Sequence, residues 1–219
     1  MIRMKKRYIL TTAVLLISLL VGAQQSSAEA KKLLDKTYAA FEASKGIRLT
    51  FRASTLDSDG NEQMAMSGTA CIKGNKFRLE SDQIDVWYDG TTQWVVMKEV
   101  NEVNISHPSA DEITAVSPLA LLGIYRDGYI LTSPVKERLN GKQVQRIRMV
   151  PALDNKQYRE VEAVIDQNSL SLSAVTLTLH NGTMQQIDIT DYNGNHNFTD
   201  MEFRFNKSRY PNIEIIDLR

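Results

Sequence analysis

The feature that most constrains this chain is a series of short apolar-alternating runs, each bounded by turn residues. Between Met64 and Met97 these runs are separated by Lys73-Gly74-Asn75, by Ser81-Asp82 and by Asp89-Gly90. Runs of this length between clusters of Gly, Asn and Asp are typical of antiparallel hairpins. The segment is therefore predicted to form several neighbouring strands of one sheet.

The same pattern covers much of the remaining chain. Ile47 to Leu56 begins with apolar and polar residues in turn, as a half-buried strand does. Asn140-Gly141 and Asn181-Gly182 each separate two further runs and are strong hairpin signals. Other strands are predicted at residues 103–105, 129–131, 135–139, 143–150, 159–165, 172–180, 183–192 and 213–218, and Phe203 and Phe205 alternate with polar residues in the same way.

Two segments carry a helical pattern instead. Ser27 to Ser44 places four apolar residues at helical spacing among charged ones. Ser109 and Glu112 form a capping-box pattern, and the segment from Pro118 to Tyr125 is apolar on nearly all sides, so it must be buried or face an apolar ligand. About eleven strands without a βαβ rhythm predict an α+β fold, in which a large antiparallel sheet curls and is closed over by a helical lid.

The first residues are predicted to be a secretory signal peptide. A basic start precedes an apolar stretch from Ile9 to Val21, which is too short for a confident membrane span, and Val21-Gly22-Ala23 fits a cleavage site. Cleavage after Ala28 and an uncleaved N-terminal anchor are the alternatives. The predicted organisation is a signal peptide over residues 1–23 and a single domain over residues 24–219.

Charge and residue chemistry argue against several function classes. The 26 basic and 26 acidic residues balance, and removal of four basic residues with the signal leaves a net charge of −4, which argues against a nucleic-acid partner. Cys71 is the only cysteine and lies inside a predicted strand, where a buried thiol is expected. His107, His180 and His196 lack metal-ligand spacing, and no catalytic motif is present. We therefore expect no metal, no cofactor and no enzymatic activity.

Five motifs, in their order along the chain, resemble the LolA family of periplasmic carriers for outer-membrane lipoproteins. After the signal and an amphipathic first helix come Ser67 to Arg78, the Asp89-Gly90 turn with Trp94, the Pro-initiated helix from Pro118 to Leu122, and an ending from Phe203 to Asp217. The resemblance implies an unclosed antiparallel β-barrel covered by helices. It implies a monomeric periplasmic carrier, or chaperone, that shields the acyl chains of lipoproteins in an apolar cavity for transfer to the outer membrane. Its partners would be acylated lipoproteins, an inner-membrane release complex and an outer-membrane acceptor.

The candidate ligand-binding residues are apolar side chains expected to line this cavity. They are Leu49, Phe51, Met64, Met66, Phe77, Leu79, Trp94, Leu119, Leu122, Phe203 and Phe205. Leu119 and Leu122 belong to the predicted lid and are expected to lie over the sheet. The methionines suit such a cavity because their side chains adapt to irregular apolar shapes.

One position departs from the family pattern. Well-studied carriers have an Arg-Pro pair after the strand that ends here at Lys73, and that Arg helps to latch the lid. Gly74 and Asn75 occupy these positions here. Alternation places Arg78 on the side opposite Phe77, so it is not expected to replace the latch. When it holds no ligand, the cavity is therefore expected to be open more often than the cavity of a carrier that has the Arg.

Two other functions remain open for the same sequence. A lipid- or lipoprotein-binding module of this fold could sense its ligand without transporting it. A hydrolase of periplasmic lipids would need a serine, a histidine and an acid that converge in the cavity, and fold class alone does not decide between these activities.

Overall fold

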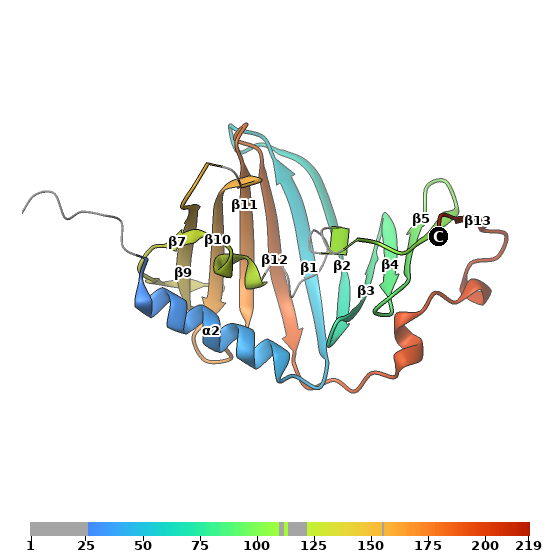
Figure 1. Cartoon of the computed structure of the whole chain (residues 1–219), viewed down its shortest axis with the longest axis horizontal. Coiled ribbons are helices and arrows are strands. Elements are labelled where there is room, and N and C mark those ends of the chain that lie inside the picture. The colour runs from blue at the N-terminus through green and yellow to red at the C-terminus, as the bar shows by residue number, and fades with distance from the viewer. Residues whose placement is uncertain (1–25, 110–111, 114–121, 155) are drawn as a thin grey trace, which may run out of the picture.

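The computed structural model describes residues 26–109, 112–113, 122–154 and 156–219. This part of the chain forms one sheet of 13 strands accompanied by one long helix (Figure 1). The strands are β1 (Ile47–Leu56), β2 (Glu62–Lys73), β3 (Lys76–Ser81), β4 (Ile84–Tyr88), β5 (Gln93–Met97), β6 (Glu102–Ser106), β7 (Tyr129–Leu131), β8 (Val135–Leu139), β9 (Lys142–Pro151), β10 (Tyr158–Asp166), β11 (Leu172–Leu179), β12 (Met184–Asn193) and β13 (Glu214–Asp217).

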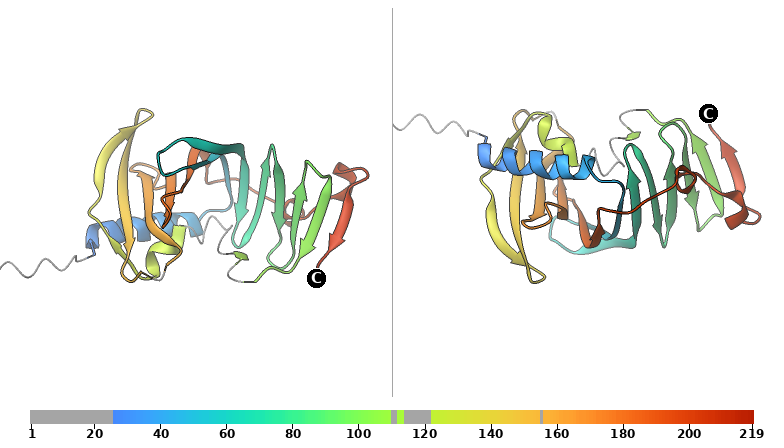
Figure 2. Two further views of the ribbon diagram at one scale, coloured as in Figure 1. Left: turned by 90° about the horizontal axis from the view of Figure 1, so that it is seen from above. Right: turned by 90° about the horizontal axis from the view of Figure 1, so that it is seen from below.

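Antiparallel pairing runs through nearly the whole sheet. Neighbouring strands pair in chain order from β1 to β6 and from β9 to β12, and β1 joins the two series because it also pairs with β12. Among these described strands only β13 pairs in parallel, with β6. It forms one edge, whereas β7 and β8 pair with β9 near the other, and the two edges lie at opposite ends of the molecule (Figure 2). The predicted curled, unclosed antiparallel sheet is therefore confirmed.

The strand count was underestimated. The sheet has 13 strands in the described residues, against the prediction of about eleven. The predicted segments nevertheless include the short edge strands β7 and β13, so the error lies in the total and not in the position of these strands.

The helix α2 (Ala28–Glu42) is positioned by a cap and an apolar stripe. Ser27 is its N-cap, and the Ser27 Oγ accepts a hydrogen bond from the amide of Ala30 at 3.2 Å. Ala30, Leu33 and Leu34 are buried in one cluster with residues of β9, β10 and β11. Figure 1 shows α2 running across this part of the sheet. The face of the sheet that receives these side chains is called the inner face, and the predicted amphipathic first helix is confirmed.

Strand alternation carries the inner face across the whole sheet. Cross-strand partners point to the same side, so the face can be followed from strand to strand. One row of direct partners crosses six strands and consists of Ile147, Ala163, Val175, Ile187, Ala53 and Met66. The inner face carries two apolar clusters, one centred on β9 to β11 beneath α2 and the other on β1 to β4.

The opposite, outer face is covered in part by the C-terminal residues. After β12 the chain forms two short 3-10 helices, η2 (Asp200–Phe203) and η3 (Lys207–Arg209), before it reaches β13. Phe203 and Phe198 pack against Cys71, whereas Phe205, Tyr210 and Ile213 pack around Trp87. The short turns of η2 and η3 therefore lie on the face opposite α2.

The alternation of Phe203 and Phe205 does not produce a strand. The Glu202 carboxylate accepts a hydrogen bond from the amide of Thr199 at 2.8 Å, which caps the first turn of η2. This local bond stabilises a helical turn at a place where the apolar pattern alone suggested an extended chain.

Candidate ligand-binding site

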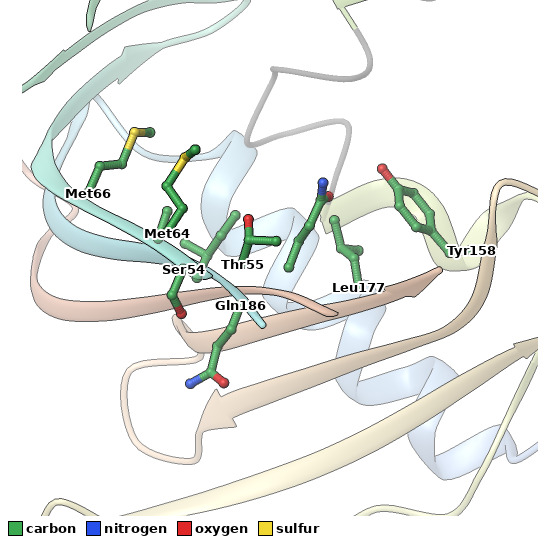
Figure 3. A pocket seen from close by; sticks show the side chains of 10 residues that line it. Ser54, Thr55, Met64, Met66, Tyr158, Leu177 and Gln186 are labelled. Carbon is green, nitrogen blue, oxygen red and sulfur yellow. The ribbon is translucent and has the colours of Figure 1, made fainter. Parts of the chain in front are cut away.

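A cavity of about 260 Å³ lies on the inner face, at the junction of the two apolar clusters (Figure 3). Its walls come from β1, β2, β10, β11 and β12, and they consist of Ala53, Ser54, Thr55, Met64, Met66, Tyr158, Leu177, Gln185, Gln186 and Ile187. The volume lies just below the roughly 300–1,000 Å³ of typical small-ligand pockets. The cavity can therefore hold part of a long apolar chain.

Strand register decides which side chains face the cavity. Thr55 lies directly opposite Met64 on one side and Gln185 on the other, and Gln185 lies opposite Leu177. Ser54 and Gln186 alternate with these residues and point away from the side on which Met64 and Met66 stand (Figure 3). The cavity side of the sheet is thus apolar with a few uncharged polar groups.

None of the ten lining residues is charged at neutral pH. Tyr158 is the one with a titratable side chain, and burial raises the pKa of its hydroxyl above the usual value. The phenol therefore stays protonated and uncharged throughout the physiological range. This arrangement suits an uncharged, largely apolar ligand.

The structure brings together six of the candidate residues on the inner face. Leu49, Phe51, Met66, Phe77 and Leu79 belong to the cluster on β1 to β4, and Met64 lines the cavity beside Met66. Only the two methionines touch the cavity directly. The other four extend the apolar surface from it toward β3 and β4, and their role as ligand contacts stays a prediction.

Three candidates lie on the outer face and do not line this cavity, so their role as ligand contacts stays a prediction. Trp94 pairs with Trp87 across β4 and β5, and both side chains alternate with inner-face neighbours, so they point outward. Phe203 and Phe205 belong to the C-terminal residues that pack on the outer face. Their aromatic side chains suggested apolar contacts with a ligand, but aromatic character does not indicate which side of the sheet a residue occupies.

The predicted lid can be followed only at its ends. Leu119 lies outside the described residues, whereas Leu122 is buried with 4% of its surface exposed. Ile113, before the apolar segment, packs on the cluster of β1 to β4, and Ile124, after it, packs on the cluster beneath α2. Both described ends therefore contact the inner face.

The far end of this segment is fastened to α2. It forms the 3-10 helix η1 (Ile124–Arg126), where the Tyr125 hydroxyl donates a hydrogen bond to Asp35 at 2.6 Å. The Arg126 guanidinium lies 3.6 Å from the centre of the Tyr38 ring, at cation–π distance. Contacts with Asp35 and Tyr38 together hold η1 beside the helix.

Gly74 and Arg78 lie where the sequence suggested. Gly74 is in the turn between β2 and β3 with φ 59°, and a Cβ there would meet no atom within 4 Å. Arg78 points to the outer face, where its Nη2 donates to the Cys71 Sγ at 3.5 Å. Arg78 therefore does not face the cavity side. The missing latch and its expected effect on opening stay predictions.

Sequence reasoning missed most of the residues that line the cavity. Leu177, Gln185 and Ile187 lie in strands that were predicted, and the parity of Leu177 with Val175 marked it as part of an apolar face. The missing information was the pairing of β12 with β1, which joins segments more than 120 residues apart. Tyr158, at the start of β10, carried no signal that could have distinguished it from an ordinary core tyrosine.

The histidines and acids of the described chain are dispersed. His107 contacts the carbonyl of Thr91, His180 contacts the carbonyl of Lys156, and His196 stacks on Phe198. Among the described residues no group of three or more His, Cys, Asp or Glu side chains is placed to hold a metal ion. In the same residues no helix is long and apolar enough to cross a bilayer.

An open, curled antiparallel sheet with one long helix on an apolar inner face places the chain in the class of half-barrel proteins. Within that class, the chain belongs to the family described as outer membrane lipoprotein carrier protein LolA, whose model matches residues 20–183. The match ends before the C-terminal residues, so the resemblance of Phe203 to Asp217 to the family ending stays a prediction. A comparison with curated proteins gives no match.

Solved structures share the fold at low sequence identity. An uncharacterized conserved protein from Thermus thermophilus is 11% identical, with a TM-score of 0.58 over 86% of this chain and 98% of that one. The Mycobacterium tuberculosis lipoprotein LppX is 15% identical, with a TM-score of 0.47 over 77% and 99% of the two chains. A LolA superfamily protein from Nitrosomonas europaea is 12% identical, with a TM-score of 0.42 over 82% and 99%. The first of these similarities supports the half-barrel fold.

Proposed function

We propose that the mature protein is a periplasmic carrier that shields lipoprotein acyl chains in the inner-face cavity during transfer to the outer membrane. The observation that carries the proposal is the uncharged cavity of about 260 Å³ set into a continuous apolar face. Membership of a family described as lipoprotein carriers supports it. In this proposal the protein acts by binding, without catalysis and without a cofactor.

The modest size of the cavity suits a carrier that must release its cargo. At about 0.8 kcal/mol per buried CH₂, three chains of roughly sixteen carbons would gain about 38 kcal/mol if fully buried, whereas non-covalent affinities saturate near about 18–21 kcal/mol. A protein that enclosed the chains completely could not hand them on. Partial shielding leaves the direction of transfer to differences in affinity among donor, carrier and acceptor.

The first described residues favour one of the two predicted cleavage sites over the other. The amide of Ser27 donates to the carbonyl of Leu131 at 2.9 Å, and the amide of Leu131 donates to the Ser26 Oγ at 3.2 Å. Cleavage after Ala28 would remove both bonds and the cap of α2. Cleavage near Ala23 preserves them, so we place the mature start at Gln24.

The alternative is a lipid- or lipoprotein-binding module that senses its ligand and does not transport it. The size of the cavity favours this sensing module because the cavity can hold only part of one acyl chain. An assay of lipoprotein transfer distinguishes the two functions. A carrier loaded with a radiolabelled lipoprotein passes it to outer-membrane vesicles, whereas a sensing module retains it.

The direct test is to purify the mature protein from its native periplasm and to identify co-purifying molecules by mass spectrometry. Acylated proteins or peptides should co-purify with the wild type. Met66→Asp places a charge on the cavity wall and should reduce their yield at least about tenfold. Ser67→Asp, which changes the next residue on the outer face, is the matched control and should bind as the wild type does. Equal yields from both variants would place the ligand elsewhere.

A further inference from the structure

The cavity contains a pair of uncharged polar groups in an otherwise apolar row. Gln185 and Thr55 are direct cross-strand partners, flanked by Leu177 on one side and Met64 on the other. In the described part of the chain no hydrogen bond engages either side chain. The next residue shows the contrast, because the amide of Gln186 faces outward and donates to the Asp188 carboxylate at 2.9 Å.

A third uncharged donor stands in the same wall. The Tyr158 hydroxyl is on the cavity side with Met64 and Leu177 (Figure 3), and it stays protonated at neutral pH because burial raises its pKa. Gln185 is exposed at the mouth of the cavity, Thr55 is half-buried and Tyr158 is buried. A plain hydrocarbon chain that covered these groups would displace water from them without replacing its hydrogen bonds. An ionised carboxylate would lose part of its hydration beside lining residues that include no cation, which is costly. A neutral carbonyl avoids both costs, because it accepts hydrogen bonds and carries no charge.

On the basis of the proposed function, we infer that Gln185 and Thr55 bind the uncharged carbonyl at the head of an acyl chain. The Gln185 amide N–H and the Thr55 hydroxyl donate to the ester or amide oxygen, and the chain lies along Met64, Met66 and Ile187. The cavity therefore selects acyl esters and acyl amides over free fatty acids. Both lipoprotein anchors and membrane glycerolipids contain such carbonyls.

The test uses the mature protein with an environment-sensitive apolar dye in the cavity. Monopalmitoylglycerol and palmitate, which have the same chain length, compete for the dye at pH 8, where the carboxyl group is ionised. The ester should displace the dye at a concentration about tenfold lower, as one or two neutral hydrogen bonds allow. Gln185→Leu should still bind the dye and should weaken ester binding about fivefold to tenfold. Gln63→Leu, at an exposed residue of β2 that does not line the cavity, is the matched control and should bind the ester as the wild type does.

Each result has a defined meaning. Equal displacement by palmitate and by the ester, or an unchanged ester affinity in Gln185→Leu that still binds dye, overturns the inference and leaves the apolar cavity intact. Failure of the wild type to bind dye or either lipid overturns the proposed function as well. When the inference holds, a synthetic triacylated lipopeptide and dipalmitoylphosphatidylglycerol are compared as competitors. Preference for the lipopeptide assigns the carbonyl to lipoproteins, and preference for the phospholipid assigns it to membrane lipids.

Discussion

Substitution of Gly68 tests how tightly the inner face is packed. Gly68 lies in β2, opposite Phe51 in β1 and Ser81 in β3. A Cβ at Gly68 would lie 2.4 Å from the carbonyl oxygen of Glu80 and 3.0 Å from the Cζ of Phe51, whereas real Cβ atoms essentially never show contacts under 3.0 Å. The difference between 3.0 and 2.4 Å means that Gly68→Ala must move the backbone of β3 by at least about 0.6 Å.

The expected cost follows from the kind of atom that is displaced. A backbone carbonyl within a hydrogen-bonded ladder cannot swing aside as a flexible side chain can, so overpacking of about 1–3 kcal/mol applies. For a domain of this size, each kcal/mol lowers the melting temperature by roughly 2–4 °C. Gly68→Ala should therefore melt about 2–12 °C below the wild type, as followed by far-ultraviolet circular dichroism.

Two further variants provide a control and distinguish the contact with the Glu80 carbonyl from the contact with the Phe51 ring. Ser67→Ala changes the exposed, outward neighbour and should alter stability by less than about 0.5 kcal/mol. Adding Phe51→Leu to Gly68→Ala relieves the contact with the ring but not the contact with the Glu80 carbonyl, so it should recover no more than part of the loss. A melting temperature for Gly68→Ala within about 1 °C of the wild type would refute the packing argument.

Three further predictions follow from other parts of the structure. Cys71 is 1% exposed and packs as a small core side chain, so Cys71→Ser should transfer cargo at near-normal rates in the vesicle assay; complete loss of transfer with an intact fold would revive a nucleophilic role. Burial, and then the hydrogen bond to Asp35, raise the pKa of Tyr125 from 10 to about 12, so the stability that the neutral phenol contributes is fully present below pH 10 and is lost between about 10 and about 12. Tyr125→Phe should accordingly be less stable than the wild type in urea at neutral pH, and the gap should close at alkaline pH; a gap that does not depend on pH would exclude this linkage. Ser27→Ala should cost about 1 kcal/mol through the lost cap, and the mature wild-type protein should have the mass of a chain that starts at Gln24; a start at Glu29 would contradict the bonds of Ser26 and Ser27 to Leu131.

The local elements of this protein could be predicted from its sequence. Ser27 begins the first helix and Asn140-Gly141 turns a hairpin because a cap and a tight turn depend on residues a few positions apart. Alternation from Ile47 predicted one buried side and one exposed side, and the structure confirms it as far as Phe51. Beyond Phe51, Ala53 is only half-buried and Ser54, on the predicted polar side, is buried. These features depend on steric contacts and hydrogen bonds between residues close together in the chain, so they can be predicted from the local sequence.

The composition of the cavity was decided only by the tertiary structure. Gln185 meets Thr55 because β12 pairs with β1, and no local pattern specifies that partner or its register. Trp94 illustrates the same limit of local sequence patterns. Alternation predicts that a strand has two faces, but which face becomes the inner one depends on where α2 and the C-terminal residues pack. Burial of apolar surface drives that choice, and it is non-directional and summed over the whole sheet, so it is settled only when distant segments meet.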